Sequence, residues 1–173
     1  MTDLRTDFGV WVGKHYPRWL RDEGERPPLS VDVVETHVVP LLGEDPVFLV
    51  VLDCMRLDQW RVIAPLISEF FEIEESYHYS ILPTATPYSR NAIFSGQYPD
   101  QIAKDRPSWW DRSDDEGSLN AFEDELLEEQ LKRITGRDVP VHYEKIFTDR
   151  NSEQVRGRVR SALKRPGSVI AMV

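Results

Sequence analysis

The chain has 173 residues and a formal net charge of −9, and 40% of its residues are hydrophobic. This length is enough for one domain with a real core, and the acidic balance argues against a broad, non-specific grip on nucleic acid. No apolar run approaches the roughly 20 residues that span a bilayer, so a membrane is not an expected partner.

Cysteine usage and the first residues indicate the compartment. The single Cys54 cannot form an internal disulfide, and residues 1–5 lack the basic and apolar regions of a signal peptide. A reducing cytoplasm is therefore the expected location.

Residues 1–45 predict a helical segment followed by a linker. In residues 4–22 aromatic and apolar side chains recur at helical spacing, namely Phe8, Trp11, Val12, His15, Tyr16, Trp19 and Leu20. Gly24 and the proline pair at 27–28 end this helix, and a short helix is expected over residues 30–42. Such an aromatic stripe indicates packing against a core or another domain.

The next elements predict an α/β sheet. Residues 47–52 are continuously apolar and β-branched, which is typical of a central parallel strand buried on both faces. Asp53 follows, then a helical pattern over residues 57–71, then a weakly alternating second strand over residues 73–82. A strand, an acidic residue and a helix in this order are typical of a doubly wound sheet with its site at the carboxyl ends of the strands.

The second half of the chain continues the same alternation. The predicted elements are a helix at about 88–94 closed by Gly96, a surface loop at 105–118, an acidic helix at 119–134, a strand at 139–147, a basic helix at 153–163 and a strand at 168–173. The pair Trp109–Trp110 is interpreted as an exposed lid or partner anchor, or else as tucked against the core. Because the last strand is of core type, we expect the natural domain to continue past Val173.

Residues suited to phosphate-ester chemistry follow the first two predicted strands. Asp53 is a hard oxygen ligand suited to zinc, magnesium or manganese. Thr84 and Thr86 lie where a helix begins, and helix N-termini attract anions. A metal-bound threonine hydroxyl is a nucleophile near neutral pH, and Arg90, one helical turn after Thr86, can hold a phosphoryl group. The alternative interpretation is a helix cap for the aspartate and turn chemistry for the threonines.

Two stretches, Val51–Trp60 and Leu82–Gly96, closely resemble the PglZ domain of the alkaline phosphatase superfamily. Residues 46–173 look like the first half of such a domain. Residues 1–45 resemble the helical segment that follows the receiver domain in the PorX-like response regulators of type IX secretion. The resemblance implies a partial doubly wound, mostly parallel α/β sheet, preceded by a helical segment, with zinc at the carboxyl ends of the strands.

The resemblance also implies roles for individual residues. Asp53 matches the metal-ligating aspartate after the first strand. In related phosphodiesterases the nucleophile precedes a glycine by ten residues, and Thr86 and Gly96 share that spacing, so Thr86 is predicted to be both nucleophile and metal ligand. Sulfatases of the superfamily carry an arginine four residues after the nucleophile, where this chain has Arg90.

Two further residues, Arg56 and Asn91, are predicted to line the substrate pocket or else to brace its loop. The resemblance implies a metal-dependent phosphohydrolase acting on a phosphodiester or nucleotide-like substrate. Because family members take further Asp and His ligands from later strands, we expect this chain alone to hold little or no zinc and to have little activity. The alternative is a signalling or scaffold module that binds protein partners, and a homodimer is a further possible assembly.

Overall fold

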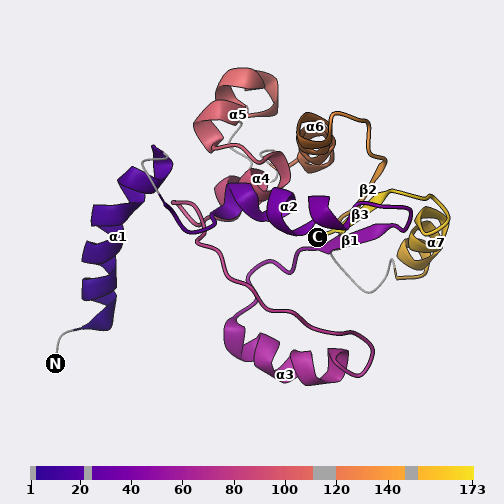
Figure 1. The fold of residues 1–173 in the computed structure, drawn as a ribbon, viewed down its shortest axis with the longest axis horizontal. Helices are drawn as coiled ribbons and strands as arrows, with labels where there is room; N and C mark the ends of the chain where they lie inside the picture. The colour runs from indigo at the N-terminus through magenta and orange to yellow at the C-terminus, as the bar shows by residue number, and fades with distance from the viewer. Residues whose placement is uncertain (1–2, 22–24, 111–119, 147–151) are drawn as a thin grey trace.

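The computed structural model, which describes residues 3–21, 25–110, 120–146 and 152–173, contains a three-stranded parallel sheet, on the right in Figure 1. Its strand order is β1–β3–β2, and the strands are β1 Val47–Val50, β2 Val141–Glu144 and β3 Val169–Met172. Val169 lies in register with Val47 on one side and Val141 on the other. The predicted α/β fold with a parallel sheet, preceded by helices, is confirmed.

Helices make up most of the remaining described structure. They are α1 Leu4–Leu20, α2 Val33–His37, α3 Leu57–Ile67, α4 Thr86–Ser95, α5 Pro99–Asp105, α6 Glu123–Thr135 and α7 Ser152–Ala162, with 3-10 turns η1 Ser30–Asp32, η2 Val39–Leu41 and η3 Pro107–Trp109. The sequence analysis did not predict α5. Pro99 occupies its first turn, where the N–H that proline lacks is not needed.

The main core lies between the sheet and the pair α4 and α6. Phe94 of α4 and Leu127 and Leu131 of α6 are fully buried and pack in one cluster with Val169 and Ala171 of β3. Burial of these side chains is the main force that holds α4 against the sheet. The core therefore fixes the helix that carries Thr86 and Arg90.

The tryptophan pair belongs to this core, so of the two interpretations of Trp109–Trp110 the one that tucks the pair against the core is confirmed, and the exposed anchor is wrong. Trp110 is buried and meets Tyr88 edge to face at 5.7 Å between ring centroids. Trp109 stacks on Phe122 at 5.4 Å. Residues 111–118 of the loop predicted there lie outside the described residues.

The prediction that the first strand is central and buried on both faces is also wrong. In the described part of the chain β1 is an edge strand, and Phe48 and Val50 on one of its faces are exposed. The helix that follows, α3, has no buried residue and stands apart from the sheet in Figure 1. Apolar side chains of α3 such as Val62 and Leu66 are exposed as well.

The second strand predicted over residues 73–82 is not formed. Within the described residues, this segment makes one isolated parallel bridge, between Tyr79 and Leu29, and belongs to no sheet. Its weak alternation has a different cause, because Tyr79 and Ile81 turn inward into a small cluster with Trp19.

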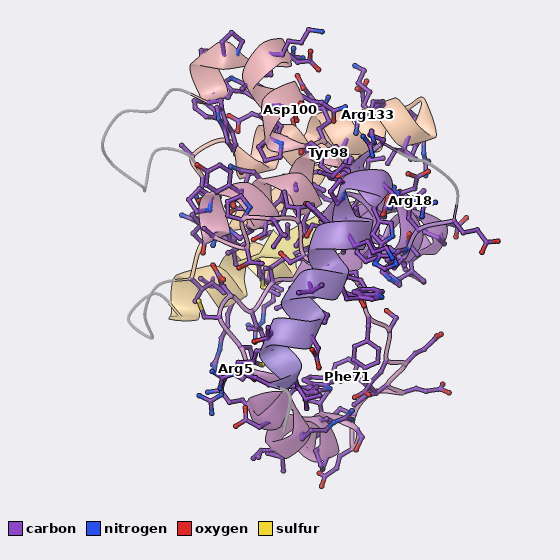
Figure 2. The ribbon with its side chains drawn as sticks, turned by 90° about the vertical axis from the view of Figure 1, so that its left-hand side faces the viewer. Arg5, Arg18, Phe71, Tyr98, Asp100 and Arg133 are labelled. Carbon is purple, nitrogen blue, oxygen red and sulfur yellow. The ribbon has the colours of Figure 1, made fainter. Side chains whose placement is uncertain are left out.

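Within the described part of the chain, helix α1 contacts the rest of the protein through its C-terminal half, from Trp11 onward. Trp19 lies 5.1 Å from the Tyr79 ring, and the Tyr16 hydroxyl accepts a hydrogen bond from the Leu82 N–H at 2.8 Å. Figure 2 views α1 from its outer side, with Arg5 near one end and Arg18 near the other. Towards its other end Phe8 is exposed. Among the helices that the structure describes, none has the length and apolar character needed to cross a bilayer.

Candidate active site at the carboxyl edge of the sheet

A pocket of about 670 Å³ lies where the three parallel strands end. Residues that follow each strand line it: Val51 and Asp53 after β1, Lys145 and Ile146 after β2, and Val173 after β3. This edge is where ligands bind in parallel α/β sheets. The sequence predicted this edge as the site, and the pocket lies there.

Asp53 reaches the pocket from a tight turn after β1. The next residue, Cys54, has a left-handed backbone with φ of 58°, which reverses the chain before α3 begins at Leu57. The Asp53 carboxylate is 39% exposed, and its Oδ2 lies 3.1 Å from Nη1 of Arg90. Asp53 and Arg90, 37 residues apart in the sequence, are thus in direct contact.

Arg90 is held from its inner side by Glu123. Its Nε donates to Oε1 at 2.5 Å and its Nη2 to Oε2 at 3.2 Å, a two-point contact between guanidinium and carboxylate. Burial alone would lower the pKa of Arg90, but the hydrogen bonds and negative charge of Glu123 raise it above its usual value. Arg90 is therefore a fixed positive charge at the pocket wall, with its side chain only 14% exposed.

Glu123 is the centre of a buried polar cluster that the sequence interpretation missed. Its carboxylate is fully buried and accepts hydrogen bonds from the Tyr143 hydroxyl and, at 2.8 Å, from Asn120 Nδ2. Lys145 Nζ lies 3.5 Å from its Oε2. One signal could have found it, because Glu123 falls in phase with Leu127 on the apolar face of an otherwise acidic helix.

The pKa of Tyr143 is strongly shifted by its place in this cluster. Burial, and then the hydrogen bond and negative charge of Glu123, raise the pKa of the Tyr143 phenol far above its usual value. The phenol therefore stays protonated and donates to Glu123 at all physiological pH values. Buried polar clusters in which each group has a partner are rigid.

The structure places Thr86 as the first residue of α4, one turn before Arg90. Thr86 is half-buried and is not among the residues that line the pocket. Thr84 is exposed in the preceding loop, where its carbonyl accepts from the Ser89 hydroxyl at 3.3 Å.

Arg56 and Asn91 lie away from the pocket lining. Arg56 is exposed and forms an ion pair with Asp58, with Nη2 at 2.8 Å from Oδ2. Asn91 is buried in α4 and its Nδ2 donates to the Pro87 carbonyl at 2.8 Å. Of the predicted site residues, the structure thus brings Asp53 and Arg90 together in the pocket.

The described side chains provide few of the ligands that zinc requires. No group of three His, Cys, Asp or Glu side chains that could hold a metal ion occurs within residues 3–21, 25–110, 120–146 and 152–173. Zinc sites in proteins have four ligands, of which at least three come from the protein. Asp53 and Thr86 by themselves do not meet that requirement, and Asp53 is already paired with Arg90.

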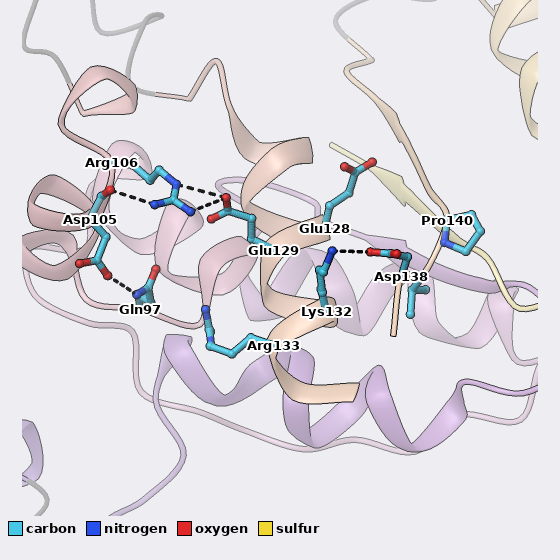
Figure 3. A pocket seen from close by; sticks show the side chains of 10 residues that line it. Gln97, Asp105, Arg106, Glu128, Glu129, Lys132, Arg133, Asp138 and Pro140 are labelled. Carbon is cyan, nitrogen blue, oxygen red and sulfur yellow. Dashed lines mark hydrogen bonds and ion pairs between the residues drawn. The ribbon is translucent and has the colours of Figure 1, made fainter. Parts of the chain in front are cut away.

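A larger groove of about 1000 Å³ lies between α5, α6 and the start of β2. Figure 3 shows two ion pairs among its charged side chains: Arg106 with Glu129 at 2.6 Å, and Lys132 with Asp138 at 2.8 Å. It lies before β2, away from the carboxyl edge. We therefore place the candidate site in the smaller pocket.

Comparison with known proteins identifies the type of domain. The family described as "BREX system PglZ alkaline phosphatase-like domain" matches residues 33–170, which include β1, β2, α4, the start of β3 and all the pocket-lining residues except Val173. No curated protein matches the chain.

Proposed function

Because the chain belongs to the PglZ family of alkaline phosphatase-like domains, we propose that it is a phosphohydrolase domain that cleaves phosphodiesters with Thr86 as its nucleophile. The observation that carries this proposal is the position of Arg90. It lies one turn after Thr86 on α4 and reaches a pocket at the carboxyl edge of the sheet, beside Asp53.

In the proposed reaction the Thr86 hydroxyl attacks phosphorus. A bond forms between the Thr86 oxygen and phosphorus, the bond to the leaving alkoxide breaks, and the hydroxyl proton ends on that alkoxide. Water then attacks phosphorus and forms a new oxygen–phosphorus bond, the bond between the Thr86 oxygen and phosphorus breaks, a phosphate monoester is released, and the proton that water loses restores the Thr86 hydroxyl. Arg90 holds the non-bridging phosphoryl oxygens and offsets the charge that develops on them, an electrostatic contribution that is often the largest in such catalysis.

The zinc that the family resemblance implies remains part of the proposal. Zinc would lower the pKa of a bound hydroxyl or water and polarise the phosphoryl group. Asp53 and Thr86 are the residues proposed to contact it, and further ligands from outside the described residues would be needed. We expect the 173-residue chain to purify with far less than one zinc per molecule, as measured by elemental analysis, and to hydrolyse phosphodiesters slowly.

Substitution of Thr86 tests the mechanism. Thr86→Ala should abolish hydrolysis of a nitrophenyl phosphodiester and remove the phosphothreonine that acid quenching traps in the parent. Thr84→Ala is the matched control, because Thr84 is exposed in the loop and should leave turnover within a few-fold of the parent. Turnover that survives Thr86→Ala would refute the assigned nucleophile.

A second candidate function is a signalling or scaffold module of the PorX-like kind, working in the cytoplasm. The exposed aromatic end of α1, with Phe8 at 54% exposure, supports it as a surface for a protein partner. Partner capture that persists in Thr86→Ala but is lost in Phe8→Ala would support this function. Capture that is unaffected by Phe8→Ala would argue against it.

A further inference from the structure

We propose that Lys145 and Arg90 together form a subsite for a tetrahedral oxyanion, and that Asp53 is the counter-ion that the incoming oxyanion displaces from Arg90. The choice of a phosphate-type ligand rests on the proposed phosphohydrolase function. The participation of Lys145 and the competition with Asp53 rest on the contacts of the pocket.

Lys145 is placed at the pocket by the sheet. It directly follows β2, so that the parallel pairing with β3 brings it to the same edge as Val173. Its Nζ donates to the Asn120 carbonyl and lies 3.5 Å from Oε2 of Glu123, and its side chain is 26% exposed. An ammonium group with three donors, tethered at its inner side, can present a donor to the pocket.

Glu123 holds the two cations as a pair. Because the carboxylate is fully buried and bonded to Arg90, Tyr143 and Asn120, it lies behind the pocket wall. Arg90 and Lys145 lie between it and the pocket, where both line the wall. A guanidinium beside an ammonium provides several N–H donors directed at one set of oxygens, a geometry suited to phosphate.

Asp53 is the competing anion. It is the more exposed carboxylate of the two that contact Arg90, and it lines the pocket. Among the four groups Arg90, Lys145, Asp53 and Glu123, the formal charges sum to zero. An oxyanion therefore has to compete with Asp53 for Arg90, and neutralising Asp53 leaves the group with one net positive charge.

Because of this charge balance, removing the negative charge of Asp53 is expected to strengthen phosphate binding. Removing a carboxylate that itself helps to bind the substrate would weaken it. Asp53→Asn should tighten the binding of inorganic phosphate by about tenfold, since one unit charge at contact distance changes affinity by about that factor at a partly exposed site. Lys145→Gln should weaken phosphate binding about fivefold to tenfold, and Lys145→Arg should restore it to within about twofold of the parent.

The experiment is a titration of the chain with inorganic phosphate, without added metal, followed by phosphorus NMR line broadening at constant ionic strength. Lys132→Gln is the matched control, because it removes the same charge at an exposed ion pair with Asp138 in the other groove. It should leave phosphate affinity within twofold. Circular dichroism establishes that each variant is folded.

Three results would overturn the inference: Asp53→Asn that binds phosphate no more tightly than the parent, no binding by either protein, or equal losses in Lys145→Gln and Lys132→Gln. If Lys145→Gln fails to fold, the exposed Asp53→Asn variant and Lys145→Arg still decide the question. Failure of the proposed function is separate, because it would appear as turnover that survives Thr86→Ala while the phosphate titrations follow the pattern above.

Discussion

The two carboxylate oxygens of Glu123, which are fully buried, both receive hydrogen bonds from the Arg90 guanidinium. Glu123→Ala would leave the positive charges of Arg90 and Lys145 without their buried carboxylate partner. Removing one partner of a buried ion pair costs about 3–5 kcal/mol of stability. We expect a loss of that size in the free energy of unfolding, measured with urea.

The control for this prediction is Glu128→Ala. Glu128 is on the same helix but exposed, and surface substitutions of this kind change stability by roughly 0.5 kcal/mol or less. A loss below about 1 kcal/mol for Glu123→Ala would show that the buried ion pair contributes little to stability.

Gly96 and Gly136 form a matched pair for testing helix ends. Both end helices with left-handed backbones, at φ of 61° and 71°. A Cβ on Gly96 would collide with the buried side chain of Gln130 and lie 3.0 Å from Arg133 Nη2, whereas a Cβ on Gly136 would meet nothing within 4 Å.

Gly136→Ala should therefore lower the free energy of unfolding by about 1 kcal/mol, the cost of placing a residue with a Cβ in a left-handed backbone conformation. Gly96→Ala should cost roughly 2–4 kcal/mol, because overpacking adds to that penalty. Urea unfolding of the two variants side by side measures the difference, and equal losses would mean that Gln130 moves aside without cost.

Cys54 is the non-glycine residue with a left-handed backbone among those described. Cys54→Gly removes a penalty of about 1–2 kcal/mol but increases the freedom of the unfolded chain by about 0.5–1 kcal/mol. We expect unchanged or slightly greater stability. Cys54→Val should instead be destabilising, because branching at Cβ makes this backbone conformation worse. A destabilised Cys54→Gly variant would indicate that the thiol makes a stabilising contact in the pocket wall.

Glu125 makes stability depend on pH. The hydrogen bond that protonated Glu125 donates to the Asp124 carboxylate, followed by burial, raises the Glu125 pKa to about 7. Between about pH 4.5 and 7 the folded protein therefore keeps a proton that the unfolded chain has released, so stability should fall as pH rises through this window. Solvent screening limits the loss to roughly 1 kcal/mol.

Glu125→Gln should remove this decline and make the protein more stable than the parent at pH 8. Thermal unfolding at half-unit pH steps measures it. Glu35→Gln, an exposed change on α2, is the control and should keep the slope of the parent. An identical slope in Glu125→Gln would assign the pH dependence to other groups.

Local signals in the sequence predicted α4 well. Pro87 in the first turn is a short-range start signal and Gly96 is a stop signal, and the helix spans Thr86–Ser95. The positions of Asp53 just after a strand and of Arg90 in the first turns of a helix could also be predicted from neighbouring residues. Both residues were therefore predicted to lie at the same edge of the sheet.

Features that depend on distant partners were not predictable in this way. The apolar pattern of β1 is the same whether or not a second layer covers Phe48 and Val50, so the sequence could not show that this face is exposed. The contact between Arg90 and Glu123 spans 33 residues, and no periodicity encodes it. Burial of an acid is only stable beside a cation, and the sequence does not show which cation that is.

The hydrogen bond from Leu82 to Tyr16 has a mechanical consequence. Helix α1 has 17 residues and is about 25 Å long, and contacts of Trp11, Tyr16 and Trp19 join its C-terminal half to the rest of the described chain. Its N-terminal part extends beyond these contacts, and the hydrogen bond of Tyr16 fastens the helix to the backbone four residues before Thr86. A tilt applied at its far end would be transmitted as strain to the segment that leads into α4, unless the hydrogen bond breaks first.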